Sequence, residues 1–128
     1  MSKKILIADD NTFNRELLQD ALKRFKTYGV TILTTENGPK TYETARAEKP
    51  DLLLLDIMMP GMSGYEICEK LKADPEMKDT YIIMVSARTQ QEDRVQAAKV
   101  GADEYVTKPY DIQHIRERVQ KVLGIEMV

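Results

Sequence analysis

The sequence DLLLLDIMMPGMSGYE, residues 51–66, combines the most apolar run of the chain with a charge at its end. The four leucines at 52–55 do not alternate with polar residues, which is typical of a strand buried on both faces of a parallel sheet. Asp56 follows this run directly, and a turn rich in Met, Pro and Gly comes next. Because a lone carboxylate is costly to desolvate, we expect other parts of the chain to supply partners for Asp56.

The rest of the chain alternates between strand-like and helix-like segments. Further apolar or β-branched runs have the length of strands, at residues 4–8, 30–35, 81–86 and 104–107. Helices are expected between and after the strands, from Asn11 or Thr12 to Phe25, from Pro39 to Glu48, and over residues 64–73, 90–99 and 112–123. This fivefold alternation predicts an α/β fold with a parallel sheet.

The first predicted helix has the clearest apolar periodicity. Its apolar residues recur at intervals of three and four, which predicts that they face the core: Phe13, Leu17, Leu18, Ala21, Leu22 and Phe25. The sequence also predicts burial or exposure for two residues outside this helix. Cys68 is expected to be a small core residue, and His114, beside the apolar stripe of the last helix, is expected to be solvated.

Length and composition set limits on the class of protein. We expect the 128 residues to form one domain, with a core from about residue 3 to residue 124. The net charge is −2 and the basic residues are scattered, which argues against direct nucleic-acid binding. No apolar run reaches the length of a membrane span, and one cysteine cannot form an internal disulfide, so we expect a cytoplasmic protein.

Charged and hydroxyl side chains stand at the carboxyl ends of four of the five predicted strands. Asp9 and Asp10 follow the first strand and Asp56 the third, while Ser86 ends the fourth and Lys108 follows the fifth. Ligands of open α/β sheets bind at this edge. Three carboxylates with no nearby His or Cys favour Mg²⁺, or Mn²⁺ in its place, and Mg²⁺ commonly also takes a phosphate oxygen.

Asp9-Asp10, Asp56, Ser86-Ala87 and Lys108-Pro109, in this order, resemble the receiver domain of two-component response regulators. The resemblance extends from Lys3 to about Gly124. It implies a flavodoxin-like (βα)5 fold, a three-layer sandwich with a five-stranded parallel sheet of order 2-1-3-4-5. It also implies a cis peptide bond before Pro109, which turns Lys108 toward the site.

The same resemblance implies a role for each site residue. Asp56 would accept a phosphoryl group from a histidine kinase or phosphotransfer protein. Asp10 and Asp56 would bind Mg²⁺ directly, Asp9 largely through water, and Met58 through its backbone carbonyl. The remaining roles fall to residues after the fourth and fifth strands: Ser86 and Lys108 would bind phosphoryl oxygens, and Ser86 with Tyr105 would form the switch.

These roles define a phosphorelay module, not an enzyme with an external substrate. The module would catalyse only its own phosphorylation and dephosphorylation, and the face made by the fourth helix, fifth strand and fifth helix would control a downstream effector protein. The alternative is a protein-binding scaffold of receiver fold that works without phosphorylation. Such a scaffold is expected to have lost an acid or the lysine, and this chain retains Asp9, Asp10, Asp56 and Lys108. The sequence does not decide between a stand-alone receiver and one domain of a longer protein.

Overall fold

The structure, a computed structural model, describes residues 3–88 and 90–126. Five strands form one parallel sheet in the order β2-β1-β3-β4-β5, as the resemblance implied. The strands are β1 (Lys3–Ala8), β2 (Val30–Thr35), β3 (Leu52–Asp56), β4 (Tyr81–Ser86) and β5 (Glu104–Thr107). The helices are α1 (Thr12–Leu22), the 3₁₀ helix η1 (Lys23–Tyr28), α2 (Gly38–Glu48), α3 (Gly64–Ala73), α4 (Gln91–Lys99) and α5 (Ile112–Leu123).

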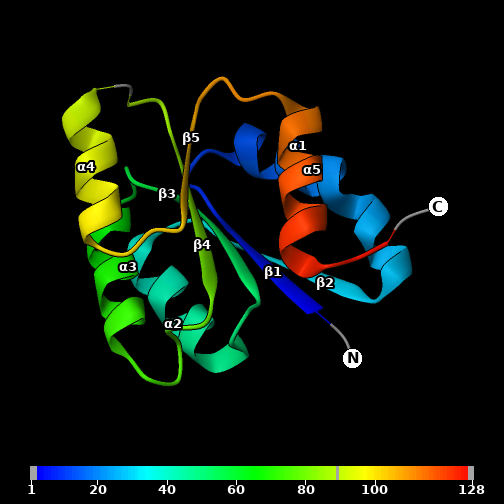
Figure 1. The fold of residues 1–128 in the computed structure, drawn as a ribbon, viewed down its shortest axis with the longest axis horizontal. Helices are drawn as coiled ribbons and strands as arrows, with labels where there is room; N and C mark the ends of the chain where they lie inside the picture. The colour runs from blue at the N-terminus through cyan, green and yellow to red at the C-terminus, as the bar shows by residue number, and fades with distance from the viewer. Residues whose placement is uncertain (1–2, 89, 127–128) are drawn as a thin grey trace.

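Helices cover both faces of the sheet, so the fold has three layers (Figure 1). Helices α1 and α5 lie on one face, and α2, α3 and α4 lie on the other. The leucines of β3 contribute alternately to two cores, Leu52 and Leu54 to the α1–α5 side and Leu53 and Leu55 to the α2–α4 side. This alternation explains why the strand contains no polar position before Asp56.

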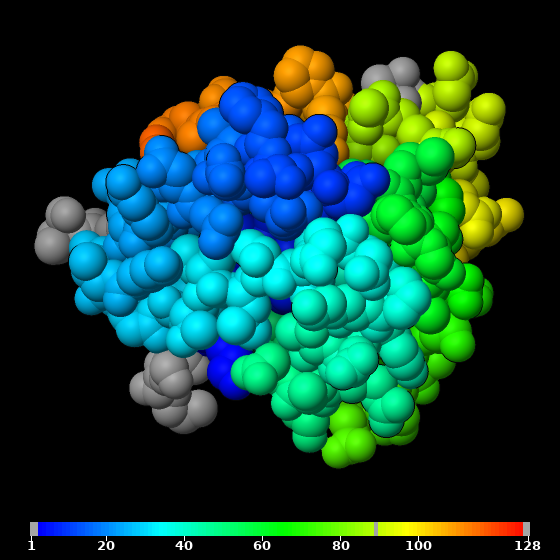
Figure 2. Space-filling view, turned by 180° about the vertical axis from the view of Figure 1, so that it is seen from behind, coloured from blue at the N-terminus to red at the C-terminus, as the bar shows by residue number. Residues whose placement is uncertain are grey.

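The first helix differs from its sequence prediction at two positions. Asn11 caps α1 by accepting a hydrogen bond from the Asn14 N–H at 2.9 Å, and Leu18 is buried as expected. Phe13 and Leu17, however, are 70% and 36% exposed. They line a groove with Pro109 and Tyr110 beside the carboxyl edge of the sheet instead of packing into the core. Figure 2 shows the molecule from behind: α1 and η1, in blue, lie next to the β2–α2 segment, in cyan, on the same face.

The turn after β3 requires a glycine at position 64. A Cβ atom on Gly64 would lie 2.6 Å from the Asp56 carbonyl oxygen, which is too close for any other residue. The Gly64 N–H instead donates to the Ile57 carbonyl at 2.9 Å and begins α3 close to the end of β3. This close approach fixes the backbone on both sides of Asp56.

Cys68 is fully buried and His114 is exposed, as the sequence predicted. Within residues 3–88 and 90–126, no helix combines the length and the hydropathy needed to cross a bilayer.

Candidate functional site

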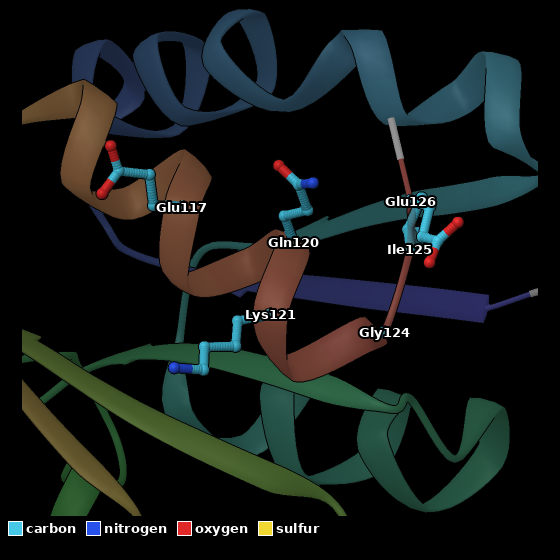
Figure 3. Close-up of a pocket in the computed structure, with 6 residues that line it drawn as sticks. All are labelled: Glu117, Gln120, Lys121, Gly124, Ile125 and Glu126. Atoms are coloured by element: carbon cyan, nitrogen blue, oxygen red, sulfur yellow. The ribbon is translucent and has the colours of Figure 1, made fainter. Parts of the chain in front are cut away.

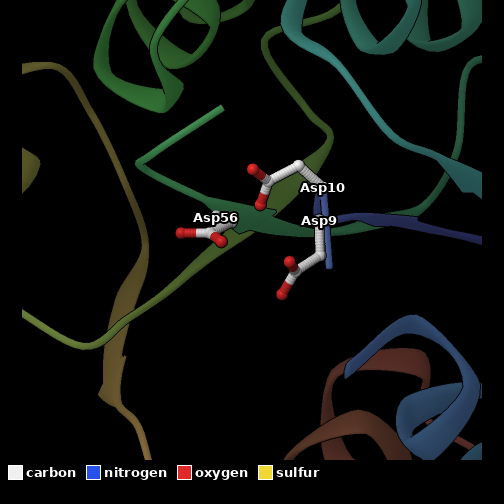
Figure 4. Close-up of side chains that lie close together, drawn as sticks. All are labelled: Asp9, Asp10 and Asp56. Carbon is white, nitrogen blue, oxygen red and sulfur yellow. The ribbon is translucent and has the colours of Figure 1, made fainter. Parts of the chain in front are cut away.

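The acidic residues at the ends of β1 and β3 converge on one point. Since β1 and β3 pair directly, with Ala8 opposite Leu55, Asp9 and Asp10 leave the sheet next to Asp56. One carboxylate oxygen from each of the three residues lies within 4.8 Å of the others (Figure 4). Asp9 and Asp56 are buried and Asp10 is exposed, so the cluster opens to solvent on one side.

Lys108 connects two of these carboxylates. Its Nζ lies 2.8 Å from Asp9 Oδ2 and 3.1 Å from Asp56 Oδ2. The peptide bond between Lys108 and Pro109 is cis, as the resemblance implied. The Lys108 N–H donates to the Ser86 carbonyl at 2.7 Å, which ties the end of β5 to the end of β4. The lysine is therefore held at the site by its backbone as well as by its charge.

The electrostatics of the cluster disfavour negative charge on Asp56. Burial raises the pKa of the Asp56 carboxyl, the Lys108 ammonium lowers it in part, and the neighbouring Asp9 raises it further. Burial alone would lower the pKa of Lys108, but its bonds to Asp9 and Asp56 outweigh burial and raise that pKa above its ordinary value. A divalent cation would supply the positive charge that the three acids lack.

Backbone groups orient the two buried carboxylates. Asp56 Oδ1 accepts the Met58 N–H at 3.2 Å, and Asp9 Oδ1 accepts the Asn11 N–H at 2.9 Å. Arg15 Nη1 donates to the Asp9 carbonyl at 2.7 Å, so α1 also holds this strand end. The Met58 side chain is 59% exposed. A methionine sulfur can bind soft metals such as copper, but among the described residues the cluster consists of carboxylates and contains no Cys or His, so Met58 is not part of a soft-metal site.

The carboxylates lie in an open cavity of about 360 Å³. Its donors to a cation are oxygens, which fits Mg²⁺ or Mn²⁺ and not zinc or copper. The cavity brings together all the predicted site residues except Tyr105, and its lining also includes two asparagines of the DDNTFN sequence and the arginine that follows β4. Its lining is Asp9, Asp10, Asn11, Asn14, Asp56, Met58, Ser86, Ala87, Arg88 and Lys108.

Ser86 and Tyr105 meet through the backbone of Arg88. The buried Ser86 Oγ accepts the Arg88 N–H at 3.1 Å, and the Tyr105 hydroxyl donates to the Arg88 carbonyl at 2.9 Å. The Tyr105 ring is half-buried, with the Arg94 guanidinium carbon 4.9 Å from its centroid. The two residues expected to act as a switch are therefore each one hydrogen bond from the same residue.

A further hollow, of about 500 Å³, lies at the end of α5. Figure 3 shows Glu117 and Gln120 pointing to one side of the helix and Lys121 pointing to the other. Their polar groups do not converge on a common point as the acids at the sheet edge do. The acidic cavity is the candidate functional site.

Fold and site together define a flavodoxin-like α/β protein with an acidic pocket, lined by three carboxylates, at the carboxyl edge of its sheet. Comparison with known families gives a narrower answer. The profile of the response regulator receiver domain matches residues 5–120, and the chain belongs to this family.

Individual relatives agree with the family match. The chain is 37% identical over 123 residues to the alkaline phosphatase synthesis transcriptional regulatory protein PhoP of Bacillus subtilis, covering 96% of this chain and 49% of PhoP. It is 35% identical over 121 residues to protein PilH of Pseudomonas aeruginosa, covering 94% of this chain and 98% of PilH. The chain thus spans about half the length of PhoP and nearly all of PilH.

Solved structures confirm the fold. The BeF3-activated receiver domain of DrrB, a Thermotoga maritima protein, superposes with a TM-score of 0.86 at 27% identity, covering 98% of this chain and 100% of that one. A receiver domain from Colwellia psychrerythraea gives a TM-score of 0.90 at 22% identity, covering 97% and 100% of the two chains. The protein is a signalling module of the receiver class.

Proposed function

We propose that Asp56 is the phosphoacceptor of this receiver. The observation that carries the proposal is the Lys108 ammonium, which lies within hydrogen-bond distance of both Asp9 and Asp56 beside a third carboxylate. A buried carboxylate that is oriented by a backbone N–H and flanked by a lysine ammonium has the requirements of a nucleophile toward phosphorus.

In the transfer, an Asp56 carboxylate oxygen forms a bond to phosphorus and the bond from phosphorus to a histidine nitrogen of the donor breaks. The electron pair of that bond stays on the nitrogen. Lys108 leaves its carboxylate partners to follow the charge of the phosphoryl oxygens, and the Ser86 hydroxyl donates to another oxygen. Ser86 can do so because the hydrogen bond from the Arg88 N–H uses a lone pair of Oγ and not the hydroxyl proton.

Asp9, Asp10 and Asp56, with the Met58 carbonyl, would hold Mg²⁺ or Mn²⁺. When bound, the cation would neutralise the acids and the incoming phosphoryl oxygens. The phosphoryl donor is a histidine kinase or phosphotransfer protein, and the α4–β5–α5 face controls a downstream effector protein. We place the module in the cytoplasm as a single domain over residues 1–128, with its core at about 3–124.

The test is incubation with acetyl phosphate and Mg²⁺ followed by intact-mass measurement. We expect the mass of one phosphoryl group on the wild-type protein, none after EDTA is added beforehand, and recovery with Mn²⁺. Asp56→Asn should remain folded and unmodified. Labelling of Asp56→Asn at wild-type level would refute the assignment, and a folded wild type that takes up no phosphoryl group would favour a scaffold that works without phosphorylation.

Ser86→Ala tests the switch separately from the chemistry. This variant should still accept the phosphoryl group, more slowly, but lose most of the spectral change that phosphorylation causes, because it lacks the hydroxyl that would bind a phosphoryl oxygen and that is bonded to Arg88, the second residue after β4. Amide chemical shifts over residues 90–110, with and without beryllofluoride, measure this change. Shifts equal to those of the wild type would show that coupling does not run through Ser86.

A further inference from the structure

Helix α4 has little apolar contact with the rest of the molecule. Of its nine residues, the structure buries Ala97 and a charged one, Asp93. Gln90, at its N-cap position, makes no side-chain capping bond. Apolar burial and capping are the usual sources of helix stability in proteins. The position of the first turn of α4 therefore depends on polar contacts.

Asp93 makes these contacts. Its Oδ1 lies 3.2 Å from Arg88 Nη1 and 3.3 Å from the Tyr65 hydroxyl, and the Tyr65 hydroxyl is also 3.3 Å from the Asp93 carbonyl. The residue is 9% exposed, so its charge is paired in a largely desolvated position. Burial and the Asp93 charge raise the pKa of Tyr65 to about 12, so the phenol keeps the proton that it donates.

Arg88 joins this carboxylate to the phosphoryl site. Its backbone N–H is bound to Ser86 Oγ, its carbonyl to the Tyr105 hydroxyl and its side chain to Asp93. Three of its polar groups are thus held by three different elements, β4, β5 and α4. A movement of Ser86 toward a phosphoryl oxygen shifts Arg88, and Arg88 transmits the shift to Asp93.

We propose that Asp93 is a positioning residue that, with Tyr65, anchors Arg88 and couples the phosphoryl site to helix α4. The proposal rests on the proposed function, because it takes Asp56 and Ser86 as the groups that bind the phosphoryl group. The anchor orients Ser86 before the phosphoryl group arrives, and it carries the change in Ser86 into α4 and, through Tyr65, to α3.

Glu92 provides a matched control. It lies next to Asp93 in the same first turn of α4 and carries the same charge, but it is exposed. Glu92→Ala removes one acid from the positive end of the helix as Asp93→Ala does, without removing a partner of Arg88. A difference between the two variants therefore reports the anchor and not the net charge or the helix dipole.

The experiment is titration of each folded variant with beryllofluoride in the presence of Mg²⁺, followed by amide chemical shifts. For Asp93→Ala we expect an apparent affinity about fivefold weaker, the size expected for loss of one hydrogen bond to a partly exposed arginine, and a shift response in residues 91–99 reduced to less than half. Glu92→Ala should match the wild type in both. Tyr65→Phe, which only removes a hydroxyl, should weaken both responses less, and it keeps the proposal testable if Asp93→Ala does not fold.

The double variant Asp93→Ala/Tyr65→Phe should bind beryllofluoride no more weakly than Asp93→Ala alone. Both substitutions disrupt the same set of contacts, so their effects should not add. Wild-type affinity together with a wild-type α4 response in Asp93→Ala, or in Tyr65→Phe if that is the folded variant, would overturn the proposal. A wild type that does not bind beryllofluoride would instead overturn the proposed function, so the two failures are distinguishable.

Discussion

Helices α4 and α5 follow β4 and β5 and lie on opposite faces of the sheet (Figure 1). Helix α5 buries Ile115, Val119 and Leu123 at four-residue intervals and ends in a left-handed Gly124. Helix α4 buries Ala97 and Asp93. Buried apolar side chains hold a helix in place whatever the charge at the functional site. Polar contacts such as those of Asp93 can instead change when the charge at that site changes. The comparison indicates that α5 is scaffold and that α4 is the element free to move.

The first test of this comparison is stability, and the largest loss is expected from a substitution in α5. Ile115→Ala removes a fully buried side chain and should lower the free energy of unfolding by about 3 kcal/mol. Ala97→Gly on α4 should cost only about 1 kcal/mol, mainly through helix propensity. Urea unfolding followed by circular dichroism measures both. Equal losses would mean that α4 is as firmly packed as α5.

A polar contact of α5 gives the next largest effect. Arg118 hydrogen-bonds Glu104 of β5, which also accepts the Tyr81 hydroxyl at 2.7 Å. Burial alone would raise the pKa of Glu104, but the bonds from Arg118 and Tyr81 lower it below its ordinary value of 4.5. Arg118→Ala should cost about 1.5 kcal/mol at pH 7.

The pH dependence of this pair has a definite sign. Because the pKa of Glu104 is lowered on folding, the pair stabilises the protein above pH 4.5, and this contribution is lost as the pH falls through the lowered pKa. The difference in unfolding free energy between the wild type and Arg118→Ala should therefore shrink below pH 4.5. A difference that stays constant to pH 3 would show that Arg118 acts through packing alone.

A smaller effect on overall stability is expected at the α4 anchor. Tyr65→Phe removes a hydroxyl whose bonds to Asp93 are long, at 3.3 Å, and should cost about 0.5–1 kcal/mol. Hydrogen exchange should become faster in residues 91–99 and stay unchanged in 115–123. Equal acceleration in both helices would mean that the substitution acts on global unfolding and not on α4.

The smallest effect concerns Cys68, whose thiol donates to the Val100 carbonyl at the end of α4. Burial raises the pKa of this thiol to about 12, so we expect very slow reaction with a disulfide reagent at pH 8. Tyr65→Phe should speed the reaction only about two- to fivefold, the equivalent of its expected cost. Rapid labelling of the wild type would contradict the close packing of α3 against α4.

The elements of the fold and the acidic cluster could be predicted from sequence because they follow from short-range patterns. The non-alternating leucines of 52–55 determine a doubly buried strand, and parallel strands place Asp9, Asp56 and Lys108 at one edge. The apolar periodicity of the first helix wrongly predicted that Phe13 faces the core. Such a periodicity identifies the side of the helix that faces the sheet, but it does not show at which residue the helix extends beyond the sheet.

The Asp93 anchor was not predictable for a different reason. Its partners Arg88 and Tyr65 are 5 and 28 residues away in the chain, and their meeting depends on how α3 and α4 pack. In the sequence, Asp93 is one of two adjacent acids at a helix start, where exposed acids are common. Only the structure distinguishes it from Glu92.

The central claim is that a phosphoryl group on Asp56 changes the α4–β5–α5 face through α4, while the apolar packing that holds α5 on the sheet stays in place. The most direct test is hydrogen exchange of the wild type and of Asp56→Asn, with and without beryllofluoride and Mg²⁺. We predict altered protection in residues 91–99 of the wild type, unaltered protection in 115–123, and no response in Asp56→Asn. A response of α5 as large as that of α4, or an equal response in Asp56→Asn, would contradict the account.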